Sequence, residues 1–209
     1  QVMYQYFDRL GLMEKSGIDL PGEAGSIMHQ IDNVGDVELA TISFGQSFQI
    51  TPIQMLRAVS AVINGGKLIT PHLGVQIVDA NGNMIRLHYN EKTHVIGSEV
   101  SDTMKILLEK VVSEGTGKKS FIEGYRIGGK TATSQKLPRG SGKYIASFIG
   151  FAPADNPEII GIVLIDEPTG AYYGGTIAAP VMREIFENVL PYYLGQWPDI
   201  ESDSGDGNE

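Results

Sequence analysis

The segment GYRIGGKT, residues 124–131, matches the phosphate-loop pattern G-x-x-x-x-G-K-[ST] at every specified position. In such loops, backbone amides and the lysine hold the phosphates of a nucleotide. Further along the chain, the apolar segment IIGIVLIDEP at 159–168 ends in an acidic pair, like the strand that holds magnesium in phosphate-loop enzymes. The spacing therefore makes a P-loop ATPase one hypothesis for this chain.

The flanks of the lysine argue against a phosphate loop. Such a loop follows a buried strand and leads directly into a helix, whose first amides hold the phosphate. The preceding stretch at 114–124, EGTGKKSFIEG, is polar and rich in glycine instead. After the lysine, Thr131 and Thr133 are weak helix formers, and Pro138 and Gly140 follow at once. We therefore expect Lys130 to lie on a strand.

Three apolar segments, 125–135, 144–154 and 158–168, are separated only by short turn sequences. Parallel strands need a crossover of a dozen or more residues, whereas short turns join antiparallel neighbours. The sequence therefore predicts an antiparallel meander with Lys130 on its first strand and Asp166 at the far end of its third.

Helices are predicted on both sides of this sheet. The segment 51–63 begins with a Thr51-Pro52 cap and a capping-box glutamine, and it ends at Asn64-Gly65-Gly66. Helices at 51–63 and 98–113 would form one layer, and a helix at 179–194 would cover the other face. A hairpin is expected around Asn81-Gly82. The predicted fold class is α+β, an antiparallel sheet flanked by helices.

Apolar residues three to four positions apart assign a buried face to each of the last two helices. The predicted inward residues are Val100, Met104, Leu107 and Val111 in the first helix, and Val181, Ile185 and Val189 in the second.

The composition is that of a globular protein with a core, since 42% of the 209 residues are hydrophobic and 20% are charged. No apolar run reaches the roughly 20 residues that a membrane-spanning helix needs. The net charge of −9 argues against a nucleic-acid partner. Part of this acidity lies in residues 196–209, which we expect to form a disordered tail after a single domain at 1–195.

Neither metal nor cofactor is expected. The chain has no cysteine, and its histidines show no metal-ligand spacing and no partner for a Ser-His-Asp triad. These histidines are His29, His72, His88 and His94.

The lysine strand resembles a different signature. Lys130-Thr131-Ala132-Thr133 is similar to the K-T-G element of penicillin-binding proteins and serine β-lactamases. Three further blocks resemble class B penicillin-binding proteins of the division and sporulation type in the same order, so the resemblance covers nearly the whole chain except its tail. The four blocks are SFGQSFQITPIQM (43–55), EGYRIGGKTATSQK (123–136), KYIASFIGFAPADNP (143–157) and YYGGTIAAPVMREI (172–185).

The resemblance implies a serine-type D,D-transpeptidase that cross-links peptidoglycan stem peptides ending in D-Ala-D-Ala and that binds β-lactams. It assigns a catalytic role to Lys130 and substrate binding to Thr131, Ala132 and Thr133. A cationic Lys130 and the two threonine hydroxyls suit the terminal carboxylate of the substrate, and the resemblance makes the Thr133 N–H an oxyanion-hole donor. Ala132 departs from the usual glycine, so its methyl group is expected to crowd or redirect the strand.

Two other motifs of this family, S-x-x-K and S-x-N, occur nowhere in the chain. In the family they lie N-terminal to the region seen here, and the chain opens within an amphipathic helical pattern of Val2, Tyr6 and Leu10. We therefore expect the C-terminal portion of a transpeptidase domain, inactive alone and completed by an upstream segment. The resemblance places the parent protein on the outer face of the bacterial cytoplasmic membrane, held by an N-terminal anchor.

Two further interpretations stay open at this point. The piece could be a non-catalytic binding module of transpeptidase-like fold that recognises cell-wall peptide or a division partner. Lys130 taken by itself could be an ordinary solvated surface lysine.

Overall fold

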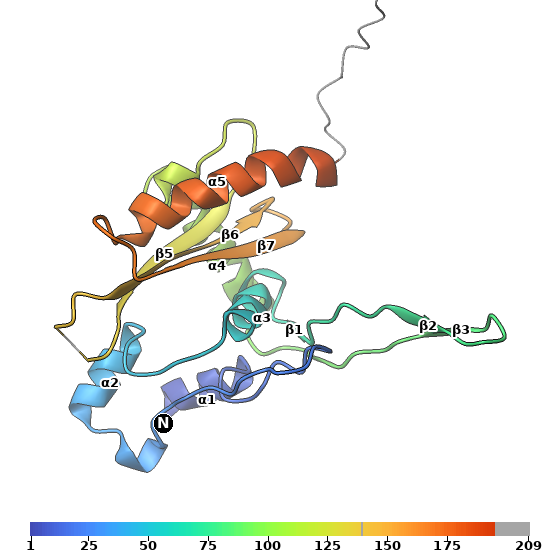
Figure 1. Ribbon diagram of the computed structural model, residues 1–209, viewed down its shortest axis with the longest axis horizontal. Helices are drawn as coiled ribbons and strands as arrows, with labels where there is room; N and C mark the ends of the chain where they lie inside the picture. Colours follow the sequence, from blue (N-terminus) through green and yellow to red (C-terminus); the bar gives the residue numbers. More distant parts are fainter. Residues whose placement is uncertain (139, 195–209) are drawn as a thin grey trace, which may run out of the picture.

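The computed structural model describes residues 1–138 and 140–194, so the predicted acidic tail lies outside the described residues (Figure 1). The helices are α1 (Val2–Arg9), η1 (Ile31–Asn33), α2 (Asp36–Ser43), α3 (Pro52–Ile63), α4 (Ser98–Ser113), η2 (Lys118–Ser120) and α5 (Gly174–Tyr193). The strands are β1 (Leu68–Ile69), β2 (Gln76–Val78), β3 (Met84–Arg86), β4 (Glu91–Lys92), β5 (Gly128–Gln135), β6 (Tyr144–Ala152) and β7 (Ile159–Asp166).

The three strands β5, β6 and β7 form one antiparallel sheet in that order. Lys130 pairs with Ile149, and Ile145 pairs with Asp166, which is the last residue of β7. The predicted meander is therefore confirmed, with Lys130 on the first strand and Asp166 at the end of the third.

Helices cover both faces of this sheet, as the sequence predicts. In Figure 1, α5 lies across one face and α4 lies against the other, beside α3. The main core cluster joins the sheet to α5 through Phe148, Met182 and Phe186, which are all at most 1% exposed. A second cluster joins Ile63 of α3 to Phe151 of β6.

The predicted inward face of α5 is wrong by one residue, and that of α4 is only partly right. In α5 the buried side chains are Ala178, Met182, Phe186 and Leu190, while the predicted Val181, Ile185 and Val189 are 37% to 43% exposed. In α4, Leu108 and Val112 are buried and the predicted Met104 packs against the second core cluster, whereas Val100 and Leu107 are more than half exposed. One residue on a helix is a rotation of about 100°, and apolar residues occupy both of the adjacent rows.

The last helix also begins five residues earlier than predicted, at Gly174 instead of 179. Pro180 therefore lies inside the helix. Gly174 starts it because a Cβ there would lie 2.2 Å from the Ser147 carbonyl oxygen and 2.3 Å from that of Ala132. The helix can approach the sheet this closely only where a side chain is missing.

The capping box of α3 is confirmed. Thr51 Oγ1 accepts from the Gln54 amide at 3.2 Å, and Gln54 Oε1 accepts from the Thr51 amide at 2.8 Å. The same helix holds the N-terminal segment, since Gln54 Nε2 donates to Ser26 Oγ and buried Arg57 forms an ion pair with Glu14.

The predicted hairpin is also confirmed, as β2 pairs with β3 around Asn81-Gly82. It extends away from the remainder of the molecule (Figure 1). Every residue of both strands is exposed, including Ile77 and Ile85, which pair with each other. None of the helices in residues 1–138 and 140–194 is long and apolar enough to cross a lipid bilayer.

Candidate functional site

The candidate site is built on β5, which pairs within the described residues with β6 alone. The Lys130 side chain is exposed, and its Nζ donates to the Thr131 carbonyl at 2.8 Å. No ion pair involves Lys130 in the described part of the chain. Its ammonium group is therefore close to the open edge of the sheet and has no carboxylate partner there.

This geometry is not that of a phosphate loop. The Gly129-Lys130-Thr131 segment lies inside a strand that continues to Gln135, so no helix N-terminus follows the lysine. The amides that would hold a phosphate belong to an extended strand instead. The match to the pattern is therefore a coincidence of sequence.

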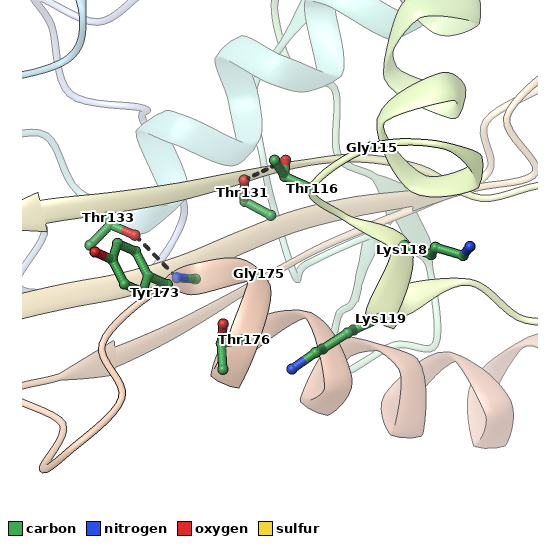
Figure 2. A pocket seen from close by; sticks show the side chains of 10 residues that line it. Gly115, Thr116, Lys118, Lys119, Thr131, Thr133, Tyr173, Gly175 and Thr176 are labelled. Carbon is green, nitrogen blue, oxygen red and sulfur yellow. Dashed lines mark hydrogen bonds between the residues drawn. The ribbon is translucent and has the colours of Figure 1, made fainter.

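Thr131 and Thr133 lie on the same face of β5, opposite to Lys130 and Ala132, because side chains alternate along a strand. Thr131 Oγ1 lies 3.0 Å from Thr116 Oγ1, and Thr133 Oγ1 accepts from the Gly174 amide at 3.1 Å. Both threonines line a cavity of about 590 Å³ beside the first turn of α5 (Figure 2). Lys118, Lys119, Tyr173 and Thr176 complete much of its wall.

Ala132 is exposed. Its methyl group lies on the face away from Thr131 and Thr133, and the strand keeps its pairing with Ser147 of β6. The strand is therefore regular at the position where the family usually has glycine.

The two glycines before Lys130 allow β5 to lie close to two phenylalanine rings of the core. A Cβ at Gly128 would lie 2.2 Å from the Phe151 ring, and one at Gly129 would lie 2.5 Å from the Phe148 ring. Both aromatic rings are at most 1% exposed, so they cannot move aside without disturbing the core. In the sequence these glycines are recognisable only as part of a motif, and no local signal reveals that they face two phenylalanines.

Charged residues gather at the other end of β5. Lys136 pairs with Asp166 and Glu167, and Lys143 pairs with Glu167, at 2.8 to 2.9 Å. The hydrogen bond from Lys136, followed by the one from Lys143, lowers the pKa of Glu167 to about 2. These four residues, which we call the strand-end ion cluster, tie the ends of all three strands together.

An aromatic stack lies next to this cluster. Tyr144 and Tyr172 are parallel with their ring centroids 4.1 Å apart, and Tyr173 contacts Tyr172 at 4.5 Å. Neither feature is predictable from the sequence, because each brings together residues from separate segments of the chain.

Comparison with known proteins identifies the class. The model of the penicillin-binding protein transpeptidase domain matches residues 1–187, so the chain belongs to this family. Stage V sporulation protein D of Bacillus subtilis (strain 168) is 43% identical over 195 residues, which cover 90% of this chain and 30% of that protein. A probable peptidoglycan D,D-transpeptidase, PenA of Neisseria meningitidis, is 35% identical and is covered to 32%.

Solved structures agree with this assignment. The chain superposes on penicillin-binding protein 3 of Mycobacterium tuberculosis in complex with ampicillin with a TM-score of 0.82 and 27% identity, covering 92% of this chain and 45% of that one. For the transpeptidase domain of Burkholderia pseudomallei penicillin-binding protein 3 the TM-score is 0.76 at 29% identity, with 95% and 59% covered. The chain thus belongs to the transpeptidase domain of a class B penicillin-binding protein and has the predicted α+β fold. It spans about a third of the length of these two curated relatives.

Proposed function

We propose that this chain supplies the substrate-facing strand of a serine-type D,D-transpeptidase, which cross-links peptidoglycan stem peptides and is acylated by β-lactams. The observation that carries the proposal is the position of Lys130, exposed on an edge strand of a penicillin-binding protein sheet without a carboxylate partner among the described residues. An ammonium group in that position attracts the terminal carboxylate of a D-Ala-D-Ala peptide.

The edge of β5 suits an extended peptide. Alternate residues of an edge strand direct their N–H and C=O groups away from the sheet, where a peptide can pair with them. The Thr131 carbonyl faces the Lys130 ammonium group, and Thr133 follows two residues later with the same orientation. We therefore assign the Thr133 N–H to the oxyanion hole, where one donor contributes about 3 kcal/mol to transition-state stabilisation.

The two threonine hydroxyls bind the substrate carboxylate in this proposal. Thr133 Oγ1 accepts from the Gly174 amide, so its own hydrogen is left to donate to a ligand. Ala132 contributes backbone groups only.

The nucleophile comes from outside these 209 residues, because no S-x-x-K or S-x-N occurs among them. The partner of this chain is then polypeptide that carries both motifs, and the chain alone has no acylation activity. We place the parent protein on the outer face of the cytoplasmic membrane, where stem peptides are cross-linked. No metal or cofactor enters the reaction.

Intact-mass analysis tests this function. The chain is incubated with a penicillin, first alone and then as part of the full-length protein. We expect no adduct on the chain alone and one penicilloyl adduct in the full-length protein, on a serine outside residues 1–209.

The matched pair of variants is Lys130→Ala and Lys110→Ala, since Lys110 is an exposed lysine on α4. Lys130→Ala should slow acylation at least a hundredfold, the size expected for loss of a catalytic electrostatic group, and Lys110→Ala should have no effect. A full-length protein that binds cell-wall peptide but is never acylated would instead indicate a non-catalytic binding module.

A further inference from the structure

One hydroxyl group in the cavity beside β5 contacts a proposed substrate-binding threonine. Thr116 lies in the turn between α4 and η2, and its Oγ1 is 3.0 Å from Oγ1 of Thr131. Figure 2 shows Thr116 and Thr131 pointing toward one another on one side of the cavity that Thr133 also lines. Thr116 therefore contacts a proposed substrate-binding residue although it belongs to a different element.

The backbone holds Thr116 in this place. The Gly117 amide donates to the Val111 carbonyl at 2.9 Å, and the Lys118 amide donates to the Gly115 carbonyl at 3.2 Å. From the other side, Gly175 of α5 lies so close that a Cβ there would be 2.5 Å from the Thr116 carbonyl oxygen. The position of the Thr116 hydroxyl is thus set by α4, η2 and α5 together.

The direction of the hydrogen bond between the two threonines depends on the ligand. Either hydroxyl can donate to the other, and each has a single hydrogen. A carboxylate is an acceptor only, so Thr131 must give its hydrogen to the ligand when it binds one. Thr131 Oγ1 is then left to accept from Thr116, and two hydrogen bonds in series polarise one another.

We propose that Thr116 is a positioning residue that aligns the Thr131 hydroxyl as a donor and so favours ligands with a carboxylate at this site. The inference rests on the proposed function, in which Thr131 faces the substrate. A neutral ligand gains less from this arrangement, because hydrogen bonds to a charged acceptor are about twice as strong as those to a neutral one. Thr116 thus contributes to specificity without touching the substrate.

The test uses the full-length protein and compares acylation by a penicillin with acylation by its methyl ester. The ratio of the two second-order rate constants measures the preference for a carboxylate. Thr116→Val keeps the shape of the side chain but removes the hydroxyl, and the ratio should fall roughly threefold to tenfold, the equivalent of one hydrogen bond. Thr116→Ser should restore it. Thr103→Val is the control, because Thr103 is an exposed threonine on α4 whose hydroxyl donates within the helix, to the Glu99 carbonyl.

A double-mutant cycle shows whether Thr116 acts through Thr131. Thr116→Val should change the ratio in the wild-type background and leave it unchanged in a Thr131→Val background. Three results would overturn the inference and leave the proposed function standing. They are an unchanged ratio in Thr116→Val, an equal loss in Thr116→Val and Thr116→Ser, and full additivity of the Thr116 and Thr131 effects on the ratio. Absence of acylation in the wild-type protein would overturn the proposed function, and this inference with it.

Discussion

Two of the antiparallel β structures among the described residues, the sheet of β5, β6 and β7 and the hairpin of β2 and β3, have opposite burial. In the sheet of β5, β6 and β7, the middle strand has Phe148 and Phe151 at most 1% exposed, and helices cover both faces. In the hairpin of β2 and β3, every residue is exposed. The sheet owes its stability to packing, whereas the hairpin depends on its turn and its backbone pairing, which alone are marginal in water.

This difference explains where a site can be built. A catalytic strand needs side chains held within a fraction of an ångström, and only a strand supported by a core provides this. Lys130, Thr131 and Thr133 lie on such a strand, and the exposed hairpin has no comparable support.

Replacement of a core phenylalanine in the sheet gives the largest expected loss of stability. Phe148→Ala should lower the free energy of unfolding by about 3 to 5 kcal/mol, because it empties a fully buried position. Ile85→Ala in the hairpin, where the side chain is 55% exposed, should cost under about 0.5 kcal/mol. Urea unfolding of both variants measures this contrast, and equal losses would contradict it.

Two glycines, Gly129 in the sheet and Gly82 in the hairpin turn, allow a second comparison of stability. Gly129→Ala should cost about 2 kcal/mol, since its Cβ would lie 2.5 Å from Phe148 in a packed core. Gly82→Ala should cost only about 1 kcal/mol, because nothing lies within 4 Å and the strain comes from its φ of +84° alone. Thermal unfolding should therefore rank Gly129→Ala below Gly82→Ala, and the reverse order would show that backbone strain outweighs packing here.

A change in the hairpin turn should stay local. Asp79 Oδ1 accepts from the amides of Asn81 and Asn83 at 2.8 and 2.9 Å. Asp79→Ala should remove about 1 kcal/mol of turn stability and speed hydrogen exchange of the amides at 76–86. Exchange in β6 should not change. Faster exchange in β6 as well would mean that the two β structures unfold as one unit.

The smallest expected effect is a pH dependence at the end of the sheet. Because hydrogen bonds from Lys136 and Lys143 lower the pKa of Glu167 from 4.5 to about 2, the folded protein keeps this carboxylate ionised where the unfolded chain does not. Its contribution is present above pH 4.5 and is lost as the pH falls toward 2. Melting temperatures of the wild type and Glu167→Gln should therefore differ at pH 6 and converge near pH 2. High salt should shrink the difference at pH 6, and a difference that is independent of pH would contradict this origin.

Much of the fold was predictable because its signals are local. The capping box at Thr51, the Asn81-Gly82 turn and the short connections of the meander each depend on a few adjacent residues. The buried face of α5 is missed by one residue and that of α4 in part, because apolar side chains occupy two adjacent rows and only the packed partner selects between them.

In the candidate site too, adjacent residues can be predicted from the sequence, whereas contacts between distant residues cannot. Lys130, Thr131 and Thr133 are contiguous and recognisable as a motif, although their proposed roles stay predictions until acylation is measured. The contacts that hold the hydroxyls come from Thr116 and Gly174, which are 15 and 41 residues away from their partners. No periodicity or spacing in a single sequence reports such pairs.

If β-lactams acylate the full-length protein as proposed, the glycines at the start of β5 and of α5 constrain how the protein can change under selection by these antibiotics. At Gly128 and Gly129 any side chain would enter a phenylalanine ring, and at Gly174 it would enter two carbonyl groups. Substitutions at these positions therefore lower the stability of the fold whatever they do to ligand binding. Ala132, whose side chain points outward from the same strand, can be exchanged without that cost. Adaptive variation in this strand should therefore accumulate at Ala132 and spare the glycines.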